Sequence, residues 1–472
     1  MAKVRVRMAP TPSGKLHLGT AHTALFNWFF AKHYQGKFVL RIDDSDPKRR
    51  QKEYEEDILE SLKWLGVSWD EGPDIGGAYG PYRQSERMGR YWQYVERLLK
   101  EGKAYYCFCS PQELEKERKK MLAEGRAPKY LGKCRSLTKA QIERLKKQGR
   151  KGAVRLKVNP GKVSFIDPSR GKVTVKAEEI GDFVIARADK SALLVTAATI
   201  DDHEMKITHT IRGEDYLNFV PRQILLFNAL DFKPPVFAHL AFIYGPDGAK
   251  LSKRHGAVAV SDYKKEGYLP EALVNYLVLL GWSPKDDREI LDIEEVIKLF
   301  DLQDVGEAGP RFDLKKLDWM NSVYIRKKSN KELLQLIKPF APKKMADDLI
   351  NQTIPLVKDR LRKLADYQGL VDFFMKRPKV PTKLVLQKGE DEKMIKSQLA
   401  ISVRRAEKVK TWQAENLEKV FRELAKENDW HVGKYFMVVR LCLTGKTATP
   451  PLFETMEVLG KRESIERLKK AF

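Results

Sequence analysis

The chain of 472 residues is strongly basic: 88 lysines and arginines face 64 acidic residues, giving a formal net charge of +24. A hydrophobic content of 42% and eight tryptophans argue against a mainly disordered chain, and the length predicts roughly two to four domains. The charge favours a polyanionic partner such as nucleic acid, with a generally lysine-rich proteome as the alternative explanation.

The sequence also indicates the cellular compartment. No N-terminal stretch has the apolar core of a signal peptide, and the apolar run at residues 272–282 is too short and interrupted to span a membrane. Four cysteines, three of them between positions 107 and 134, are too few and too unevenly placed for a secreted disulfide framework. We therefore expect a cytoplasmic protein with no membrane partner.

The N-terminal region contains the first informative motif, PSGKLHLGT at residues 12–20. It follows an apolar, β-prone run and precedes a run of helix formers, so the order predicts a strand, a glycine turn and a helix N-terminus. Backbone N–H groups in such a turn can bind phosphate. Strand and helix signals alternate up to about residue 75, as in a parallel sheet with crossover helices.

A lysine-rich segment of helices followed by strands, residues 76–189, has the character of an α+β insertion. Sheet-like sequence returns after it, so residues 1–75 and 190–240 are expected to form one split Rossmann-like domain, with its site at the carboxyl ends of the strands. The insertion contains Cys107, Cys109 and Cys134. This spacing suits structural zinc, but for three cysteines without a nearby histidine buried free thiols are the default interpretation.

A second motif, KLSKR at residues 250–254, follows a cluster of turn formers. Lys250 and Lys253 are therefore expected on a mobile loop able to reach a polyphosphate. Either motif alone could be an ordinary loop histidine or a solvated lysine cluster, but the two together indicate ATP-dependent adenylation.

Beyond about residue 325 helical periodicity replaces the strand signals. A link containing two prolines at residues 377–381 divides this region into two expected helical subdomains, residues 326–378 and 379–472. Its many lysines and arginines suit RNA, while most of its aromatic residues are expected in the core.

These motifs resemble those of class I aminoacyl-tRNA synthetases, because residues 17–20 and 250–254 stand where that class has its HIGH and KMSKS signatures. Further segments resemble the glutamyl-tRNA synthetase family, and in its bacterial form the resemblance extends to the C-terminus. These segments are residues 7–14, 24–28, 41–46, 80–85, 201–203, 211–215, 267–273, 443–445 and 450–453.

The resemblance implies an α/β fold: a Rossmann-like nucleotide-binding catalytic domain with an inserted acceptor-stem-binding domain, then a stem-contact segment and an all-α anticodon-binding region. Residues 241–325, with the KLSKR loop, correspond to the stem-contact segment. The implied activity is glutamate–tRNA ligase: L-glutamate reacts with ATP and Mg²⁺ to form glutamyl-adenylate, and the glutamyl group passes to the 3′-terminal ribose of tRNA. We also expect a monomer that requires bound tRNA for activation.

The resemblance assigns His17, Lys250 and Lys253 to catalysis, and it adds Gly19 and Ser252 to the residues that bind ATP. No residue need act as a nucleophile, because the carboxylate of the substrate attacks phosphorus and the protein supplies geometry and charge.

The implied amino-acid site depends on two arginines, since arginine binds carboxylates in bidentate geometry. Arg7 is expected on the side-chain carboxylate of glutamate and Arg212 near its α-carboxylate. Ala9 and Thr11 would shape the pocket, and Asp43 would meet the amino group.

Two of these positions depart from the family pattern. Asp43 replaces the usual glutamate, and Leu194 stands where a tyrosine hydroxyl helps to bind the substrate. Losing one hydrogen bond to a charged group would cost about 1.5–3 kcal/mol, enough to retune selection. The sequence alone does not determine how Asp43, Leu194 and Ala198 affect amino-acid selection.

The family likeness also implies zinc ligands at Cys107, Cys109, Tyr130 and Cys134. Arg360 resembles an arginine that some glutamate-specific enzymes use to read the anticodon, with a charged helix face as the alternative. Two other functions stay open: a form that also glutamylates tRNA(Gln), and a non-catalytic tRNA-binding relative.

Overall fold

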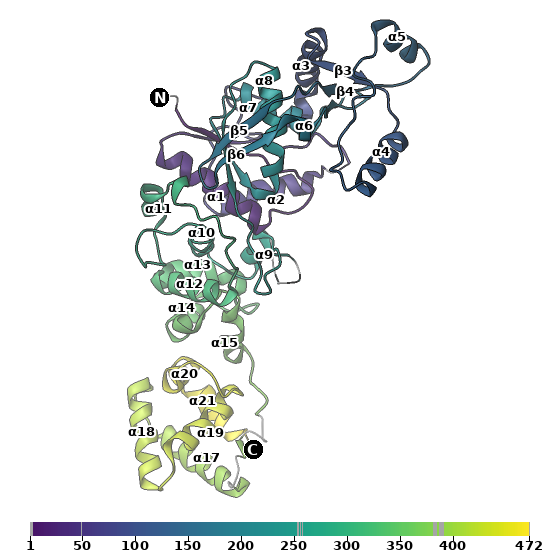
Figure 1. Cartoon of the computed structure of the whole chain (residues 1–472). Helices are drawn as coiled ribbons and strands as arrows, with labels where there is room; N and C mark the ends of the chain where they lie inside the picture. The colour runs from purple at the N-terminus through teal and green to yellow at the C-terminus, as the bar shows by residue number, and fades with distance from the viewer. Residues whose placement is uncertain are drawn as a thin grey trace. The chain divides into compact units, whose positions relative to one another are not determined.

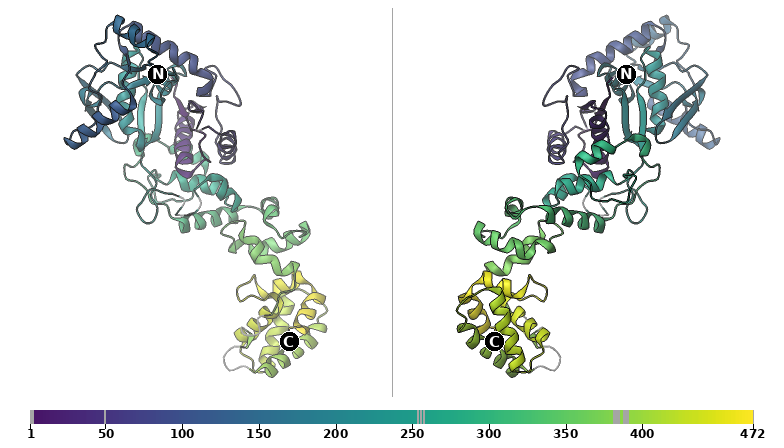
Figure 2. Two further views of the ribbon diagram at one scale, coloured as in Figure 1. Left: turned by 90° about the vertical axis from the view of Figure 1, so that its right-hand side faces the viewer. Right: turned by 90° about the vertical axis from the view of Figure 1, so that its left-hand side faces the viewer.

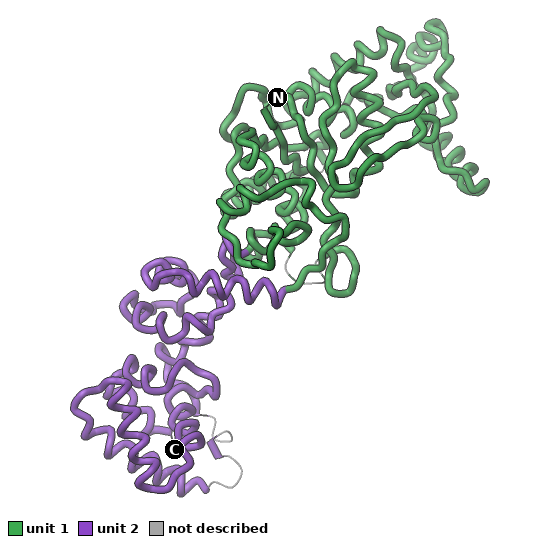
Figure 3. Tube along the Cα trace, turned by 60° about the vertical axis from the view of Figure 1, so that its left-hand side comes forward, with its two compact units in different colours: residues 1–263, 273–313 green, residues 264–272, 314–472 purple. Residues whose placement is uncertain are grey.

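The computed structural model describes residues 3–48, 50–252, 254, 256, 258–380, 385–386 and 391–471. The chain divides into two compact units, Met1–Tyr263 with Leu273–Asp313, and Lys264–Ala272 with Leu314–Phe472 (Figure 3). Within the described residues no helix is long and apolar enough to cross a membrane.

The first unit is built on a four-stranded parallel sheet of order β2-β1-β8-β9. Its strands are β1 (Arg5–Met8), β2 (Lys37–Leu40), β8 (His209–Gly213) and β9 (Val236–Leu240). The chain leaves β1 toward β2 on one side and returns through β8 to β9 on the other. The strand order therefore reverses between β1 and β8, the point at which open α/β sheets bind ligands outside the carboxyl ends of their strands.

Helix α1 (Leu18–His33) connects β1 to β2 and packs against β1, β2 and β8. Eleven of its sixteen residues are buried, as expected of a helix covered on most sides. Asn27 donates a hydrogen bond to the carbonyl oxygen of Ile211 at 3.0 Å, which fixes the helix against β8. The N-terminus of α1 is thereby held at the carboxyl edge of the sheet.

The segment between β2 and β8 contains a three-stranded antiparallel sheet of order β3-β4-β7 and the hairpin β5–β6. Helices α4 and α5 lie beyond β3 and β4 (Figure 1). The elements of this segment are α2 (Lys52–Trp64), α3 (Met88–Lys100), β3 (Ala104–Cys107), α4 (Pro111–Ala123), α5 (Lys139–Lys147), β4 (Ala153–Leu156), β5 (Lys162–Asp167), β6 (Gly171–Lys176), α6 (Ala177–Ile180), β7 (Val184–Ala186) and α7 (Leu194–Glu204). Helix α8 (Val220–Ala229) follows β8 and leads to β9.

One hydrophobic core joins this inserted segment to the parallel sheet. It contains Tyr91 of α3, Ile185 of β7, Ile200 of α7, Phe227 of α8 and Phe237 of β9, all almost fully buried. The insertion therefore shares its core with the sheet that it interrupts.

The described part of the second unit is helical, as Figures 1 and 2 show. Its helices are α12 (Leu314–Lys327), α13 (Asn330–Ile337), α14 (Asp347–Val357), α15 (Asp366–Met375), α17 (Glu392–Glu407), α18 (Ala414–Glu427), α19 (Val432–Thr444), α20 (Leu452–Leu459) and α21 (Lys461–Lys469). The helices α9 (Val260–Lys265) and α10 (Pro270–Val278) lead from one unit to the other along the chain, and α11 (Ile293–Leu299) belongs to the first unit.

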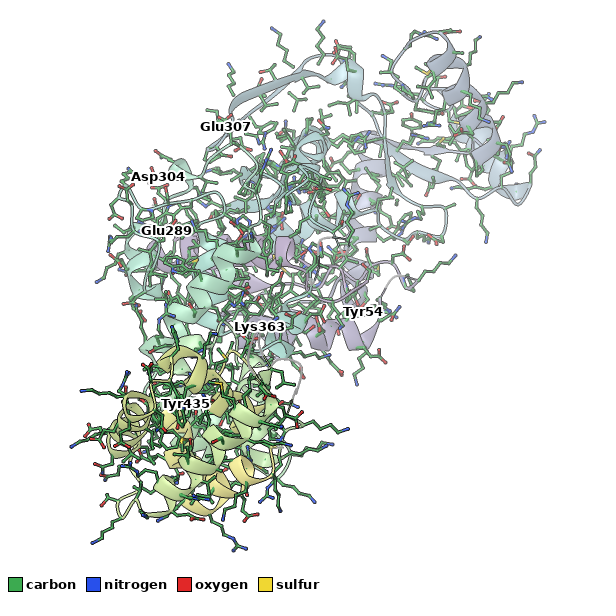
Figure 4. The ribbon with its side chains drawn as sticks, turned by 90° about the horizontal axis from the view of Figure 1, so that it is seen from below. Tyr54, Glu289, Asp304, Glu307, Lys363 and Tyr435 are labelled. Atoms are coloured by element: carbon green, nitrogen blue, oxygen red, sulfur yellow. The ribbon has the colours of Figure 1, made fainter. Side chains whose placement is uncertain are left out.

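Helices α17 to α21 enclose a separate core. Tyr435 lies among them (Figure 4), and its hydroxyl group is 2.6 Å from the hydroxyl of Ser402. Helix α19 is capped by Gly445, which has a φ of +72°, and a Cβ there would lie 2.8 Å from the Cβ of Pro378. A glycine is required on both counts.

Candidate active site

The site begins with two arginines at the carboxyl edge of the parallel sheet. Arg7 and Arg212 are the second-to-last residues of the neighbouring strands β1 and β8, and both are buried. Burial, together with the nearby charge of Arg7, lowers the pKa of Arg212 to about 9. Two buried cations that repel each other favour an anionic ligand.

Asp202 and Arg41 extend this cluster. Asp202 accepts hydrogen bonds from Arg7 at 3.2 Å and from Arg41 at 2.8 Å. Arg41 also donates to both carboxylate oxygens of Asp43, at 2.7 and 3.3 Å. The expected amino-group ligand Asp43 thus lies in the same cluster, in a bidentate pair with Arg41. Burial raises the pKa of Asp43, and Arg41 opposes that rise.

Ala9 and Thr11 lie in the loop after β1, where both are half-buried. The carbonyl of Pro10 in this loop accepts a hydrogen bond from the N–H of Asp43 at 3.0 Å. The loops that follow β1 and β2 are therefore joined beside the arginines.

His17 is the N-cap residue of α1, and its Nδ1 accepts a hydrogen bond from the N–H of Thr20 at 3.4 Å. Desolvation lowers the pKa of His17, and the charge of Lys250 lowers it further. The ring of His17 is therefore neutral near pH 7, and its Nε2 lies 2.9 Å from the Thr20 hydroxyl.

The segment after the KLSKR motif lies directly against the His17 turn. The N–H of Leu18 donates to the carbonyl of Val258 at 2.8 Å, and the N–H of Val260 donates to that of Leu16 at 2.9 Å. The backbone of Lys250 forms an antiparallel β-bridge with that of Tyr244, and the Nζ of Lys250 lies 3.5 Å from the ring centroid of Phe242.

The structure therefore brings His17, Gly19 and Lys250 to one end of the sheet. Ser252 follows in the same loop, and Lys253 lies outside the described residues. A Cβ at Gly19 would meet only the ring of His17, at an ordinary 3.5 Å. The glycine is thus not required by protein packing and keeps open the space at the N-terminus of α1.

Leu194 has a different environment from the arginines. It begins α7, is half-buried and lines a cavity of about 450 Å³ together with Tyr130, Arg155, Phe219 and other residues. Neither Arg7 nor Arg212 lines this cavity. Ala198 lies one turn further along α7 and is buried.

The three cysteines of the insertion converge on one point. The sulfurs of Cys107, Cys109 and Cys134 all lie within 4.8 Å of one another, with 3.6 Å between Cys109 and Cys134. The hydroxyl of Tyr130 is 3.5 Å from the sulfurs of Cys107 and Cys109. A tetrahedral zinc site requires about 3.8 Å between thiolates and about 3.5 Å between a thiolate and an oxygen, so these four side chains fit zinc.

Arg360 belongs to the second unit, where it ends the short helix η6 (Lys358–Arg360) and is exposed. Burial lowers the pKa of Arg440, and the charge of Arg360 contributes to this shift. Two arginines therefore lie close together on this unit.

Arg41 and Asp202 organise the site, yet sequence reasoning assigned no role to either. Both lie in segments that the family resemblance had identified, residues 41–46 and 201–203. The sequence did contain a signal for each of them: Arg41 is a charged residue directly after an apolar strand, and Asp202 is a charged residue within a largely apolar helix.

Two protein families match this chain. The family described as tRNA synthetases class I (E and Q), catalytic domain, matches residues 3–319, and the anticodon binding domain matches residues 332–472. Fold and site thus define a class I tRNA synthetase with an anticodon-binding domain.

Individual relatives agree. The chain is 42% identical to glutamate–tRNA ligase 1 of Caldicellulosiruptor saccharolyticus, over 99% of this chain and 98% of that protein. It is 42% identical to glutamate–tRNA ligase 2 of Thermoanaerobacter pseudethanolicus, over 100% and 98%. The crystal structure of a glutamate tRNA ligase from Elizabethkingia meningosepticum in complex with its amino acid matches with a TM-score of 0.91 at 35% identity, covering 99% of each chain.

The chain therefore belongs to the glutamate–tRNA ligase family. The resemblance and the fold class predicted from the sequence are both confirmed. The boundaries of the expected domains and the individual site residues stay predictions.

Proposed function

We propose that this chain is a glutamate–tRNA ligase that activates L-glutamate with ATP and then glutamylates the 3′-terminal ribose of tRNA(Glu). The observation that carries this proposal is the placement of Arg7 and Arg212 on adjacent strand ends, beside the turn that contains His17. Cytosol is the expected compartment and a monomer the expected working form.

The charges of the cluster match those of glutamate. Arg7 and Arg41 pair with the carboxylates of Asp202 and Asp43, and Asp201, 3.7 Å from Arg41, pairs with Arg87. The side-chain hydrogen bonds of Arg212 go to the neutral groups of Gln223 and His239, so its positive charge is left over. Glutamate has two carboxylates and one ammonium group and therefore brings one negative charge. Arg7 would bind the side-chain carboxylate, Arg212 the α-carboxylate and Asp43 the ammonium group.

Activation requires the α-carboxylate to attack the α-phosphorus of ATP, with pyrophosphate as the leaving group. The ring of neutral His17, at the N-terminus of α1, would donate a hydrogen bond to a phosphate oxygen, and Lys250 would supply positive charge toward the pyrophosphate. By family likeness Lys253 and Ser252 would act from the same loop. ATP would arrive with Mg²⁺, which neutralises part of the phosphate charge.

The inserted segment would hold the acceptor end of tRNA, and the helical second unit, with Arg360, would meet the anticodon. Cys107, Cys109, Cys134 and Tyr130 would bind zinc, which would fix the loops of the insertion in place.

The experiment that tests the amino-acid site is the substitution Arg7→Lys. Lysine keeps the charge but loses the bidentate geometry, so the KM for glutamate should rise by about ten- to a hundredfold, as expected when one charge-assisted hydrogen bond is lost. The rise would be measured by ATP–pyrophosphate exchange in the presence of tRNA.

Arg5→Lys is the matched control, because Arg5 lies on the same strand but pairs with Glu71 at 2.8 Å. It should leave the KM for glutamate unchanged. An unchanged KM in Arg7→Lys would refute the assignment of Arg7.

A further inference from the structure

His239 is the direct neighbour of Arg212 across the strand pair β8–β9, and its side chain is almost fully buried. The Nε of Arg212 donates to the Nε2 of His239 at 3.4 Å. On the other side of the ring, Nδ1 lies 2.6 Å from a carboxylate oxygen of Asp167, which is also fully buried. Asp167, His239 and Arg212 thus form a continuous line of contacts.

This line fixes the proton of the imidazole. A carboxylate can only accept, so Nδ1 must carry the hydrogen and Nε2 must present its lone pair to Arg212. The Nη2 of Arg212 donates to the amide oxygen of Gln223 at 2.8 Å. His239 and Gln223 therefore orient two of the three guanidinium nitrogens, which leaves Nη1 for a ligand.

We propose that Asp167 and His239 are positioning residues that hold Arg212 in the geometry required to bind the amino acid. Asp167 sets the tautomer of His239, and His239 in turn accepts from the Nε of Arg212. This inference rests on the proposed role of Arg212 as a carboxylate ligand.

Asp167 belongs to the insertion, where it ends β5 at the turn of the β5–β6 hairpin. Two further residues of this turn hold it against the parallel sheet. The Ser169 hydroxyl lies 3.1 Å from the carbonyl of His239, and Arg170 donates to Glu214, directly after β8, at 2.6 Å. The hairpin of the insertion thereby determines the orientation of an amino-acid ligand in the catalytic sheet.

The substitution Asp167→Asn tests the tautomer directly. The other carboxylate oxygen of Asp167 accepts from the N–H of Ser169 at 3.0 Å, so an asparagine must keep its carbonyl oxygen there and turn its NH₂ toward His239. Nδ1 would then accept, and the hydrogen would move to Nε2, where it opposes the Nε–H of Arg212. The variant keeps the shape of the site and reverses one hydrogen bond.

We expect Asp167→Asn to raise the KM for glutamate by about tenfold or more, the effect of losing one hydrogen bond of a charged group, and to leave the KM values for ATP and tRNA within about twofold. The matched control is Asp189→Asn, the same change at an exposed aspartate that accepts from the N–H and hydroxyl of Ser191 at 2.9 and 2.6 Å, and it should leave the KM for glutamate near that of the parent protein. An unchanged KM for glutamate in Asp167→Asn, or an equal rise for all three substrates, would overturn the proposal.

A second measurement reads the tautomer in the unmodified protein. The ring ¹⁵N shifts of His239 in the unmodified protein, identified among its eight histidines by their loss in His239→Gln, should report the Nδ1–H tautomer. The Nε2–H tautomer would overturn the proposal. The variant Arg212→Ala tests the proposed role of Arg212 independently of Asp167 and His239. If Arg212→Ala leaves the KM for glutamate unchanged, Arg212 is not a ligand of glutamate and the site assignment itself is wrong.

Discussion

The two buried arginines of the site differ in how their charge is balanced. Arg7 has an anionic hydrogen-bond partner, Asp202, whereas the partners of Arg212 are the neutral side chains of Gln223 and His239. This difference agrees with the lowered pKa of Arg212. An anionic ligand would therefore stabilise Arg212 more than Arg7, which supports its proposed place beside the α-carboxylate that reacts.

His22 provides a prediction at the residue scale. It is buried in α1, where Nε2 lies 2.6 Å from the carbonyl of Leu280, and burial lowers its pKa from 6.5 to about 4. The unfolded chain therefore binds a proton at His22 before the folded chain does. The contribution of neutral His22 to the free energy of unfolding is fully present above pH 6.5 and is lost as the pH decreases toward 4. Between pH 7 and pH 5 the free energy of unfolding should decrease by about 2 kcal/mol.

Urea denaturation of the parent protein and of His22→Gln at pH 7 and pH 5 would measure this effect. Glutamine keeps a donor for Leu280 but does not titrate, so its loss of stability on acidification should be smaller by that amount. Equal losses in the two proteins would show that His22 is not responsible.

The predicted site residues were identifiable because their motifs are local in the sequence. Their partners were not, since Arg7 and Asp202 are 195 positions apart and meet only when β8 is placed beside β1. The pairing of Asp43 with Arg41 likewise depends on the buried geometry after β2. The environment of Leu194 depends on how α7 packs against the insertion.

At the scale of elements, the N-terminus of α1 is held open for a ligand. Gly19→Ala should fold normally, with an equal or higher melting temperature, because a Cβ there meets only His17 at 3.5 Å and alanine favours helix. Its KM for ATP should nevertheless rise by about tenfold, equivalent to roughly 1.4 kcal/mol, because the methyl group occupies the space that a phosphate would approach.

Gly89→Ala is the matched control, since Gly89 lies at the start of α3 with nothing within 4 Å of an added Cβ. It should leave the KM for ATP unchanged. A Gly19→Ala variant with the KM for ATP of the parent protein would contradict a nucleotide site at this helix end.

The cysteine cluster of the insertion makes a second prediction at this scale. Protein purified without chelators should contain one zinc ion per chain by elemental analysis, and Cys109→Ser should lose it, because serine is a much weaker zinc ligand than a thiolate. Cys442→Ser should keep the zinc, because Cys442 is buried in α19, in the other unit. Zinc-free parent protein, or zinc retained in Cys109→Ser, would refute the site.

The alternation of strands and helices in the sequence was sufficient to predict the split parallel sheet, because buried parallel strands and their crossover helices have clear periodic patterns. The shared core of insertion and sheet was not predictable. Tyr91, Ile200 and Phe237 are ordinary apolar positions until the tertiary fold brings them together.

At the scale of the whole molecule, the two compact units contain different candidate sites. The unit with the parallel sheet contains the candidate sites for amino acid, nucleotide and zinc, and the helical unit contains Arg360. A net charge of +24 suits a chain whose largest proposed ligand is a polyanion.

The most direct test is aminoacylation of separately transcribed tRNA(Glu) and tRNA(Gln) with glutamate and with glutamine. A glutamate–tRNA ligase attaches glutamate to tRNA(Glu) and attaches glutamine to neither tRNA. Attachment of glutamate to both tRNAs would show that the protein is a glutamate–tRNA ligase that also accepts tRNA(Gln). Tight tRNA binding without any transfer of glutamate to tRNA(Glu) would contradict the account.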